Sequence, residues 1–324
     1  MPSSIRAFAI VSRAEFLLPN LGSLIMGLAW GASPPLGLIN ALVLIVVSFS
    51  VINLSSAIGA QVNTLSDYTL DLKDERKKEL VEALGFFGHR RLKAVILVEL
   101  VLTLALVSLF TMMQGKLILL AMWVVGISLG YAYSAPPLRL KSRSWVAPIS
   151  LILVLGVFPL LFAYYAFTFD ISLFFLMSVS GLALTIYGVI VPTEIRDYFG
   201  DKAMKIETMT VMLGLSRASL LSMVLLASGS VLAGTALLLE WLSSGRYWLT
   251  PILVAIPAVV AYVLRQLRKL QIQSERYESS EGETQISLGR SIVELSAQNP
   301  RWIMMVTQTY SLLSATLLAS KFLL

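Results

Sequence analysis

Two pairs of aspartates in this sequence have a spacing suited to binding metal ions. Asp67 is followed by Asp71 and Asp197 by Asp201, four residues apart in each pair, and the second pair follows the first by 130 residues. Residues four apart lie on one face of an α-helix, so each pair presents two carboxylates side by side. Four carboxylates that meet without counter-charge repel one another, whereas Mg²⁺ prefers hard oxygen ligands and binds water and phosphate oxygens as well. Two facing pairs therefore suit two magnesium ions that bridge a diphosphate.

A stripe of polar residues extends from the first pair toward the N-terminus. Asn63 lies four residues before Asp67, and Asn53 and Ser56 continue the same helical face. A single aspartate near a membrane surface is best explained as the solvated end of a helix. Two matched pairs favour a functional site instead, because ionisable residues near membrane depth are functional by default.

A third candidate segment lies between the two pairs and runs from Tyr131 to Lys141. Pro136 and Pro137 are expected to end a helix there, because proline cannot donate to the helical ladder and restricts the residue before it. Arg139 and Lys141 follow directly. These cations either bind phosphate or belong to the general excess of positive charge on cytoplasmic loops, and both interpretations fit the sequence equally well.

The composition is that of a membrane protein. Of the 324 residues, 57% are hydrophobic and 14% are charged, and the mean hydropathy is +0.80. With no cysteine and the single His89, the chain offers neither disulfides nor an imidazole or thiolate metal site, so any metal must be bound by oxygen. The net charge of +6 does not require a nucleic acid partner, because membrane proteins concentrate Lys and Arg on cytoplasmic loops.

Nine apolar stretches are long enough to cross the roughly 30 Å of hydrocarbon in a bilayer, which takes about 20 helical residues. Their approximate spans are 14–33, 38–62, 92–112, 117–136, 146–167, 171–193, 209–235, 248–266 and 301–321. We expect an integral membrane protein of the cell membrane whose N-terminus stays attached, because no small-residue cleavage site follows the first stretch.

The distribution of positive charge predicts the orientation. With a cytoplasmic N-terminus, the cytoplasmic side holds 22 of the 25 Lys and Arg residues, and Lys116, Arg246 and Lys321 lie outside. An asymmetry of this size is typical of a fixed topology. The aspartate pairs then lie on the cytoplasmic side.

The polar connections on that side are long, as expected for the face that holds a functional site. We expect one transmembrane domain over residues 1–324, with Asp-rich cytoplasmic loops at 63–91 and 194–208 and a polar cytoplasmic loop at 267–300. Within the first loop, charged and apolar residues at helical spacing predict an amphipathic helix from Asp71 to Arg91 that lies on the membrane face. The last loop is best explained as a solvated connector.

These motifs resemble those of the UbiA superfamily of intramembrane prenyltransferases. That family has a first motif NxxxDxxxD, a YSxPPxRxK segment after its fourth helix and a second Asp-rich motif after its sixth. The residues that match here are Asn63, Asp67, Asp71, Tyr133, Ser134, Pro136, Pro137, Arg139, Lys141, Asp197 and Asp201. Residues 205–208, followed by Gly214, are similar to the family's continuation of the second motif. The resemblance covers essentially the whole chain.

The resemblance implies an all-α fold in which nine transmembrane helices surround a central cavity with cap helices on the cytoplasmic side. It implies an enzyme, a prenyltransferase, in which Mg²⁺ held by the four aspartates binds an isoprenyl diphosphate such as geranyl or geranylgeranyl diphosphate. The prenyl group would pass to an aromatic or lipid acceptor within the membrane, and its tail would lie between helices next to membrane lipids. Further substrate contacts are implied for Asn63, Ser134, Arg139, Lys141, Tyr68, Tyr133 and Tyr198.

Several roles stay open at this point. The tyrosine rings either face a carbocation or are ordinary interfacial tyrosines. Glu99, in the third span, either contacts the acceptor, acts as a base or forms a structural hydrogen bond. The chain also departs from the family at Thr64, where many members have Asp, and it lacks their Arg-Pro pair after the first motif. The acceptor and the prenyl chain length therefore remain undetermined, and no protein partner is indicated.

Two other functions fit the same residues. An intramembrane terpene cyclase of the same superfamily would ionise the same diphosphate without an external acceptor. A secondary transporter would also use buried carboxylates, but transporter sites usually lie near the middle of the membrane, whereas these aspartates lie at helix ends.

Overall fold

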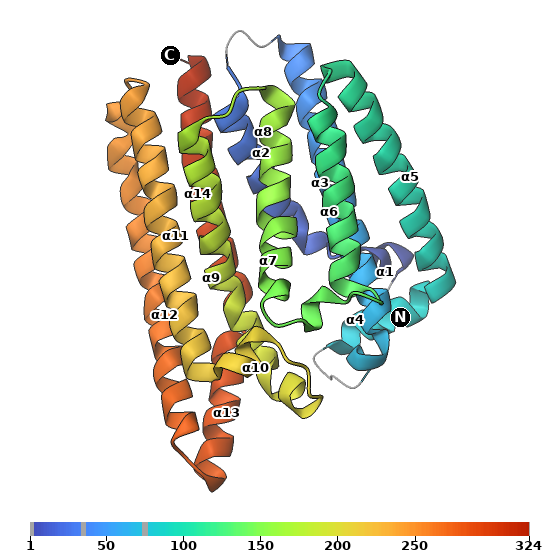
Figure 1. Ribbon diagram of the computed structural model, residues 1–324, viewed down its shortest axis with the longest axis vertical. Coiled ribbons are helices and arrows are strands. Elements are labelled where there is room, and N and C mark those ends of the chain that lie inside the picture. Colours follow the sequence, from blue (N-terminus) through green and yellow to red (C-terminus); the bar gives the residue numbers. More distant parts are fainter. Residues whose placement is uncertain (1–2, 34–36, 73–76, 324) are drawn as a thin grey trace. The chain divides into compact units, whose positions relative to one another are not determined.

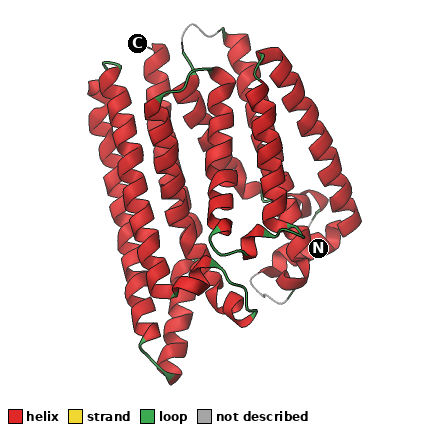
Figure 2. Cartoon of the chain, in the orientation of Figure 1, coloured by secondary structure: helices red, strands yellow, loops and turns green. Residues whose placement is uncertain are grey.

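The computed structural model describes residues 3–33, 37–72 and 77–323 (Figure 1). Over these residues the chain is almost entirely helical, and no β-strand is formed (Figure 2). A single isolated bridge within the described ranges joins Ser144 to Thr208. The predicted all-α class is confirmed.

The described part of the chain contains eight helices that are long and apolar enough to cross a membrane, or nine if a bent pair counts as one span. The bent pair is Ser4–Val11 with Ala14–Gly31, whose axes differ by 63°. Arg13, at the bend, has φ 51°, a left-handed conformation that interrupts a helix. This count agrees with the nine predicted spans if the bent pair, which contains the predicted stretch 14–33, forms the first of them.

The chain divides into two compact units. The first contains residues up to Leu140 together with Phe158–Thr168, and the second contains Lys141–Val157 together with the chain from Phe169 onward. The first unit has the helices α1 (Ser4–Val11), η1 (Ala14–Phe16), α2 (Leu17–Gly31), α3 (Leu38–Asp71), α4 (Lys78–Phe87), α5 (His89–Gln114), α6 (Leu117–Ser134) and α8 (Phe158–Phe167). The second has α7 (Val146–Ile152), η4 (Leu153–Val157), α9 (Leu173–Ala203), α10 (Met209–Leu213), α11 (Leu215–Ser243), η5 (Tyr247–Val254), α12 (Ala255–Glu278), α13 (Gly282–Ser296) and α14 (Asn299–Leu323), and the short turn η3 (Leu140–Ser142) spans the boundary.

In the first unit, α2 packs closely against α8 through two glycines. A Cβ at Gly27 would lie 2.7 Å from the Tyr164 backbone nitrogen, and one at Gly31 would lie 2.7 Å from the Tyr164 carbonyl oxygen. Membrane helices gain little from the hydrophobic effect, so they associate where small residues let their backbones approach. The GxxxG spacing of these glycines therefore fixes α2 against α8.

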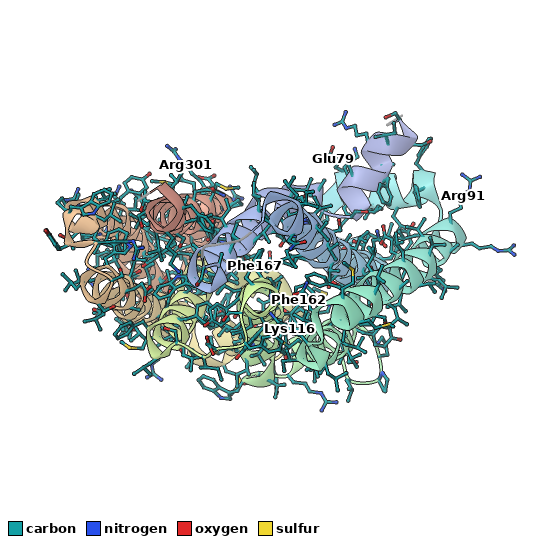
Figure 3. The ribbon with its side chains drawn as sticks, turned by 90° about the horizontal axis from the view of Figure 1, so that it is seen from above. Glu79, Arg91, Lys116, Phe162, Phe167 and Arg301 are labelled. Carbon is teal, nitrogen blue, oxygen red and sulfur yellow. The ribbon has the colours of Figure 1, made fainter. Side chains whose placement is uncertain are left out.

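Lys116 is the last residue of the turn between α5 and α6, and its cationic side chain is buried. Its side chain is 4% exposed, and Nζ donates to the carbonyl oxygens of Tyr165 at 2.8 Å and Thr168 at 3.1 Å. These are carbonyls at the C-terminal end of α8, where a positive charge is favourable. Figure 3 labels Lys116 together with Phe162 and Phe167 of that helix. Burial lowers the pKa of the Lys116 ammonium.

The predicted amphipathic helix from Asp71 to Arg91 is only partly correct. Residues 73–76 lie outside the described ranges, α4 covers Lys78–Phe87, and Gly88 then adopts φ 90° and separates α4 from α5. A positive φ of this kind is accessible mainly to glycine and ends the helix there. The apolar side of α4 packs on α1 and α5 in a cluster formed by Ala7, Val11, Ala83, Leu84 and Leu92.

In the second unit, α9 and α11 pack along a seam of small residues. A Cβ at Gly188 would lie 2.6 Å from the Leu226 backbone nitrogen, and one at Gly229 would lie 2.5 Å from the Thr185 backbone nitrogen. Ser222 donates a short hydrogen bond across the seam to the Gly188 carbonyl. The seam leads along α9 toward Asp197 and Asp201, so it determines where the end of this helix lies.

The polar stretch 267–300 is helical, which corrects the prediction of a solvated connector. The helix α12 continues to Glu278, and after a short turn α13 runs back along it from Gly282 to Ser296 (Figure 1). Gly289, Ile292 and Ser296 are the buried positions of α13, which is the i, i+3, i+7 pattern of an amphipathic helix. Its many Ser and Glu residues occupy the solvated face.

Candidate active site

The last turns of α3 present a line of polar side chains. Asn63, Asp67 and Asp71 follow one another at four-residue intervals, and the two aspartates are only 7% and 4% exposed. Both predicted metal ligands of the first motif thus lie on the helix itself, not in a loop. A rigid helix end holds the two carboxylates at a fixed separation.

Arg139 reaches the first of these carboxylates. Its NH2 nitrogen donates to Asp67 Oδ1 at 3.0 Å, and Ser134 Oγ donates to Asn63 Oδ1 at the same distance. The helix α6 ends at Ser134, two residues before Pro136 and Pro137, which were predicted to end it. Arg139 has φ 39°, a conformation that costs energy for a residue with a Cβ and is retained where surrounding contacts require it. The segment after α6 is therefore built around the end of α3.

Asp71 forms an ion pair with a residue that the motifs did not predict. Lys77 Nζ lies 2.7 Å from Asp71 Oδ1, and the two side chains are 35% and 5% exposed. Each carboxylate of the first pair therefore accepts a charge-assisted hydrogen bond from a cation of the same unit.

The second pair lies on the last turns of α9, in the other unit. Asp197 Oδ1 accepts from Arg196 Nε at 3.2 Å. The helix continues to Ala203, so Asp197 and Asp201 are helical residues, and the predicted loop 194–208 begins only after α9 ends. Because the two pairs belong to different units, their meeting around bound cations stays a prediction.

Glu194 extends the second pair and was not among the predicted site residues. It accepts hydrogen bonds from Tyr187 at 3.3 Å and from Thr210 at 3.0 Å. Thr210 belongs to α10, whose first turn is capped by the Thr208 hydroxyl. Glu194 thus ties α10 to α9 next to Asp197. The signal in the sequence was its position three residues before Asp197, on the same helical face.

The segment after Arg139 contacts residues 205–208, which follow the second Asp-rich motif. Ser144 donates its backbone N–H to the Glu207 carbonyl at 3.2 Å and forms the isolated bridge to Thr208. Lys141 lies three residues earlier in the short turn η3. Its assignment as a phosphate-binding residue stays a prediction.

The predicted tyrosines have packing partners. The Tyr68 ring meets His89 edge-on with centroids 4.4 Å apart, and the Tyr198 ring lies under Lys202, whose Nζ is 5.4 Å from the ring centroid. Tyr133 is half-buried on α6. These contacts explain Tyr68 and Tyr198 as structural residues, and a role in facing a carbocation stays a prediction for all three.

Glu99 is the buried carboxylate of α5. It is 8% exposed and shares a hydrogen bond with Gln61 of α3, which in turn donates to Ser12 Oγ at 2.9 Å. Further along α3, Asn53 accepts from Asn20 at 2.9 Å, so the predicted polar stripe is used to join α3 to its neighbours. These bonds favour the structural role among the alternatives for Glu99.

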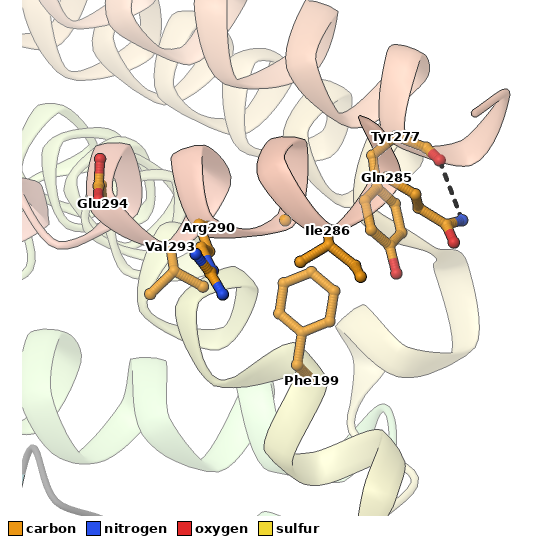
Figure 4. A pocket seen from close by; sticks show the side chains of 8 residues that line it. Phe199, Tyr277, Gln285, Ile286, Arg290, Val293 and Glu294 are labelled. Atoms are coloured by element: carbon orange, nitrogen blue, oxygen red, sulfur yellow. Dashed lines mark hydrogen bonds between the residues drawn. The ribbon is translucent and has the colours of Figure 1, made fainter. Parts of the chain in front are cut away.

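A groove of about 470 Å³ lies on the second unit between α9, α12 and α13. Phe199, Tyr277 and Ile286 line it, with Arg290 and Glu294 along α13 (Figure 4). It contains none of the predicted site residues. Phe199 is two positions from each aspartate of α9 and so lies on another face of that helix.

The donor chemistry of the two helix ends fits magnesium. Each end offers two carboxylates at four-residue spacing, and Asn63 adds an amide oxygen, all hard ligands of the kind that Mg²⁺ prefers. In the described residues no three acidic or histidine side chains gather into one metal-binding group. A complete site would therefore use both pairs together with oxygens of the substrate.

The all-α membrane fold, the Asp-rich helix ends and the cationic segment after α6 are those expected of an intramembrane prenyltransferase. The model of the UbiA prenyltransferase family matches residues 17–279. The chain belongs to this family, and it is therefore an integral membrane prenyltransferase. No curated protein sequence matches the chain.

Solved structures share the fold. The chain is similar to a UbiA homologue from Archaeoglobus fulgidus bound to GPP and Mg²⁺, with a TM-score of 0.60, 18% identity and coverage of 93% of this chain and 99% of that one. It is also similar to a digeranylgeranylglyceryl phosphate synthase, with a TM-score of 0.63, 15% identity and coverage of 97% and 99%. An apo UbiA homologue from Aeropyrum pernix K1 gives a TM-score of 0.56 at 15% identity, with coverage of 91% and 98%.

Proposed function

We propose that this prenyltransferase moves a polyprenyl group from an allylic diphosphate, such as geranyl or geranylgeranyl diphosphate, to an aromatic or lipid acceptor within the membrane. The observation that supports it best is the pairing of Arg139 with Asp67 at the end of α3, which puts a phosphate-binding cation next to a metal-binding carboxylate. The similar Archaeoglobus fulgidus proteins were solved with GPP or DMAPP and Mg²⁺.

In this proposal Asp67, Asp71, Asp197 and Asp201 hold magnesium. When bound, the metal neutralises charge that develops on the leaving diphosphate. Asn63, fixed by Ser134, and Arg139 orient the diphosphate oxygens by hydrogen bonds that strengthen as the carbon–oxygen bond breaks. The apolar helices keep water away from the reactive prenyl group, so that the acceptor meets it first.

The proposed orientation places both aspartate pairs and the N-terminus in the cytoplasm. The excess of Lys and Arg on the connections that follow even-numbered spans supports it. The diphosphate head would then bind at the cytoplasmic face with its tail among membrane helices.

The test is transfer by the purified protein in nanodiscs. Radiolabelled geranyl, farnesyl and geranylgeranyl diphosphates are incubated with Mg²⁺ and a panel of aromatic and lipid acceptors, with and without a chelator. We expect acceptor-dependent, chelator-sensitive transfer that falls by at least roughly a hundredfold in Asp67→Asn and in Asp197→Asn. Asp170→Asn, at an exposed aspartate between α8 and α9, is the matched control and should stay active.

The same experiment distinguishes the alternatives. Cyclised or hydrolysed prenyl product that forms equally without any acceptor would support the terpene cyclase instead. Full activity of both Asp→Asn variants would contradict the proposed site.

A further inference from the structure

Two consecutive lysines precede and begin α4, and only one of them binds a site carboxylate. Lys77 Nζ lies 2.7 Å from Asp71 Oδ1, whose side chain is 5% exposed. Lys78 is 78% exposed and lies 3.9 Å from Glu82 on its own helix. The Lys77 pair is thus a close contact with a buried acid, whereas the Lys78 pair is an ordinary surface pair.

Packing of α4, and not the ion pair, fixes the backbone of Lys77. Lys77 is the N-cap residue of α4. The helix is anchored by buried Ala83 and Leu84, which pack in one cluster with Ala7 and Val11 of α1. Lys77 therefore remains beside the end of α3 whatever its ammonium group binds.

The position of this ammonium conflicts with the proposed metal site. A divalent cation on Asp71 would lie within a few ångströms of Lys77, and like charges at that range repel strongly where water is scarce. The ammonium then needs another anion. The ammonium group of a lysine sits on a flexible four-carbon chain, and its three N–H donors rotate freely. It can therefore change partners without moving its backbone.

The only new anion that binding of the substrate brings to this place is the diphosphate. We propose that Lys77 is a further substrate-binding residue. Its ammonium group pairs with Asp71 in the free enzyme and moves to a diphosphate oxygen when the magnesium–diphosphate complex binds. This inference rests on the proposed function. None of the motifs assigned a role to Lys77, which lies in the stretch that replaces the family's Arg-Pro pair.

The exchange of partners makes metal binding depend on the diphosphate. A metal ion that binds alone must displace Lys77 without offering it another anion, whereas the diphosphate supplies one. Two ligands coupled in this way strengthen each other's binding reciprocally. The enzyme would thus bind metal and diphosphate together and bind free metal weakly.

The experiment measures metal binding and catalysis separately in the full-length protein in nanodiscs. Binding of Mn²⁺ without diphosphate is followed by the loss of the free-ion EPR signal, and KM for geranylgeranyl diphosphate is measured with Mg²⁺. In Lys77→Met we expect Mn²⁺ to bind roughly three- to tenfold more tightly and KM to rise by roughly the same factor. Lys77→Arg should resemble the wild type, and Lys78→Met is the matched control that should change neither quantity.

Opposite changes in the two affinities are the signature of the exchange. Weaker Mn²⁺ binding together with a higher KM in Lys77→Met would mean a merely structural role and would overturn the inference, as would values equal to those of Lys78→Met. If the wild type neither binds Mn²⁺ nor transfers prenyl groups, the proposed function fails. If the wild type does both and Lys77→Met matches it, only the role of Lys77 fails.

Discussion

The carboxylates at the end of α3 are each accompanied by a cation of a different kind. Asp67 accepts from the guanidinium of Arg139, which has a planar set of donors, and Asp71 accepts from the ammonium of Lys77. A guanidinium can bind a carboxylate and a phosphate oxygen at the same time, whereas an ammonium is a compact charge on a flexible chain. The two cations therefore suit different tasks, the first in orienting a substrate and the second in exchanging partners.

Substitutions of Arg139 test whether this residue contacts the diphosphate. Arg139→Lys keeps the charge but loses the fork geometry and must still adopt φ 39°, so we expect KM for the prenyl diphosphate to rise by roughly tenfold with a smaller change in kcat. Arg139→Gln should raise it further. Steady-state kinetics at saturating acceptor measure both. Arg143→Gln, at an exposed arginine four residues later, is the control; equal KM values in all the variants would contradict a diphosphate contact by Arg139.

At the scale of elements, glycine seams set the positions of the helices that present the site. Both α2–α8 and α9–α11 approach closely enough that a methyl group would collide with backbone atoms. In a membrane this close packing replaces the hydrophobic effect as the source of helix association. The hydropathy of the spans did not indicate the seams. Glycine and serine are common in membrane helices and do not by themselves mark a contact between two helices.

Substitutions along α9 test the seam. In Gly188→Ala the new Cβ would lie 2.6 Å from the Leu226 nitrogen, so α9 and α11 must separate, and we expect Tm to fall by several degrees. Gly59→Ala is the matched control, since nothing lies within 4 Å of its Cβ and alanine favours a helix by about 1 kcal/mol. Thermal unfolding followed by size-exclusion chromatography measures both. A Tm that falls equally in the two variants would contradict the seam.

Lys116 should make the stability of the folded protein depend on pH. Burial lowers the pKa of its ammonium, so the folded state releases this proton at a lower pH than the unfolded state, whose lysine titrates near 10.5. The unfolded state then binds more protons between the lowered pKa and 10.5, and stability rises with pH over that window. Lys116→Met should lose hydrogen bonds to three carbonyls and be less stable at neutral pH.

The measurement is the Tm difference between the wild type and Lys116→Met from pH 7 to pH 10. We expect this difference to widen as pH rises, because only the wild type gains from proton release. A difference that narrows instead would mean that the α8 carbonyls stabilise the charged form more than burial opposes it. Lys116→Arg, which cannot titrate in this range, should show no such pH dependence.

The sequence predicted those features of the protein that depend on local pattern. Apolar stretches of about twenty residues gave the nine spans, because a bilayer leaves a backbone few alternatives to the helix. Four-residue spacing placed Asp67 with Asp71 and Asp197 with Asp201 on shared helical faces. The proline pair correctly ended α6 at Ser134.

Features that depend on tertiary contacts were not predictable in this way. Glu194, Lys77 and Lys116 each bind atoms that are distant in sequence or beyond a break in the helix, and no spacing rule indicates such partners. The stretch 267–300 was interpreted as a connector because its many Ser and Glu residues obscured the buried positions of α13. Polar composition alone therefore did not distinguish a solvated helix from a loop.

The proposed orientation can be tested directly because the chain contains no cysteine. A single cysteine at exposed Ser279, between α12 and α13, should react with a membrane-impermeant maleimide only in inside-out vesicles. One at exposed Ser243, the last residue of α11, should react only in right-side-out vesicles. Labelling of both positions from the same side would contradict the topology.

The boundary between the two units crosses the run of helix formed by α7, η4 and α8, and this has a consequence for biosynthesis. The glycine face of α2 emerges from the ribosome early, but its partner α8 is not made until Phe167 is complete. During that interval more than a hundred residues are synthesised and α2 has no permanent neighbour on this side. The nascent N-terminal half should therefore depend on lipid or on the insertion machinery to shield that face, and a chain released after α6 should be a substrate for membrane quality control.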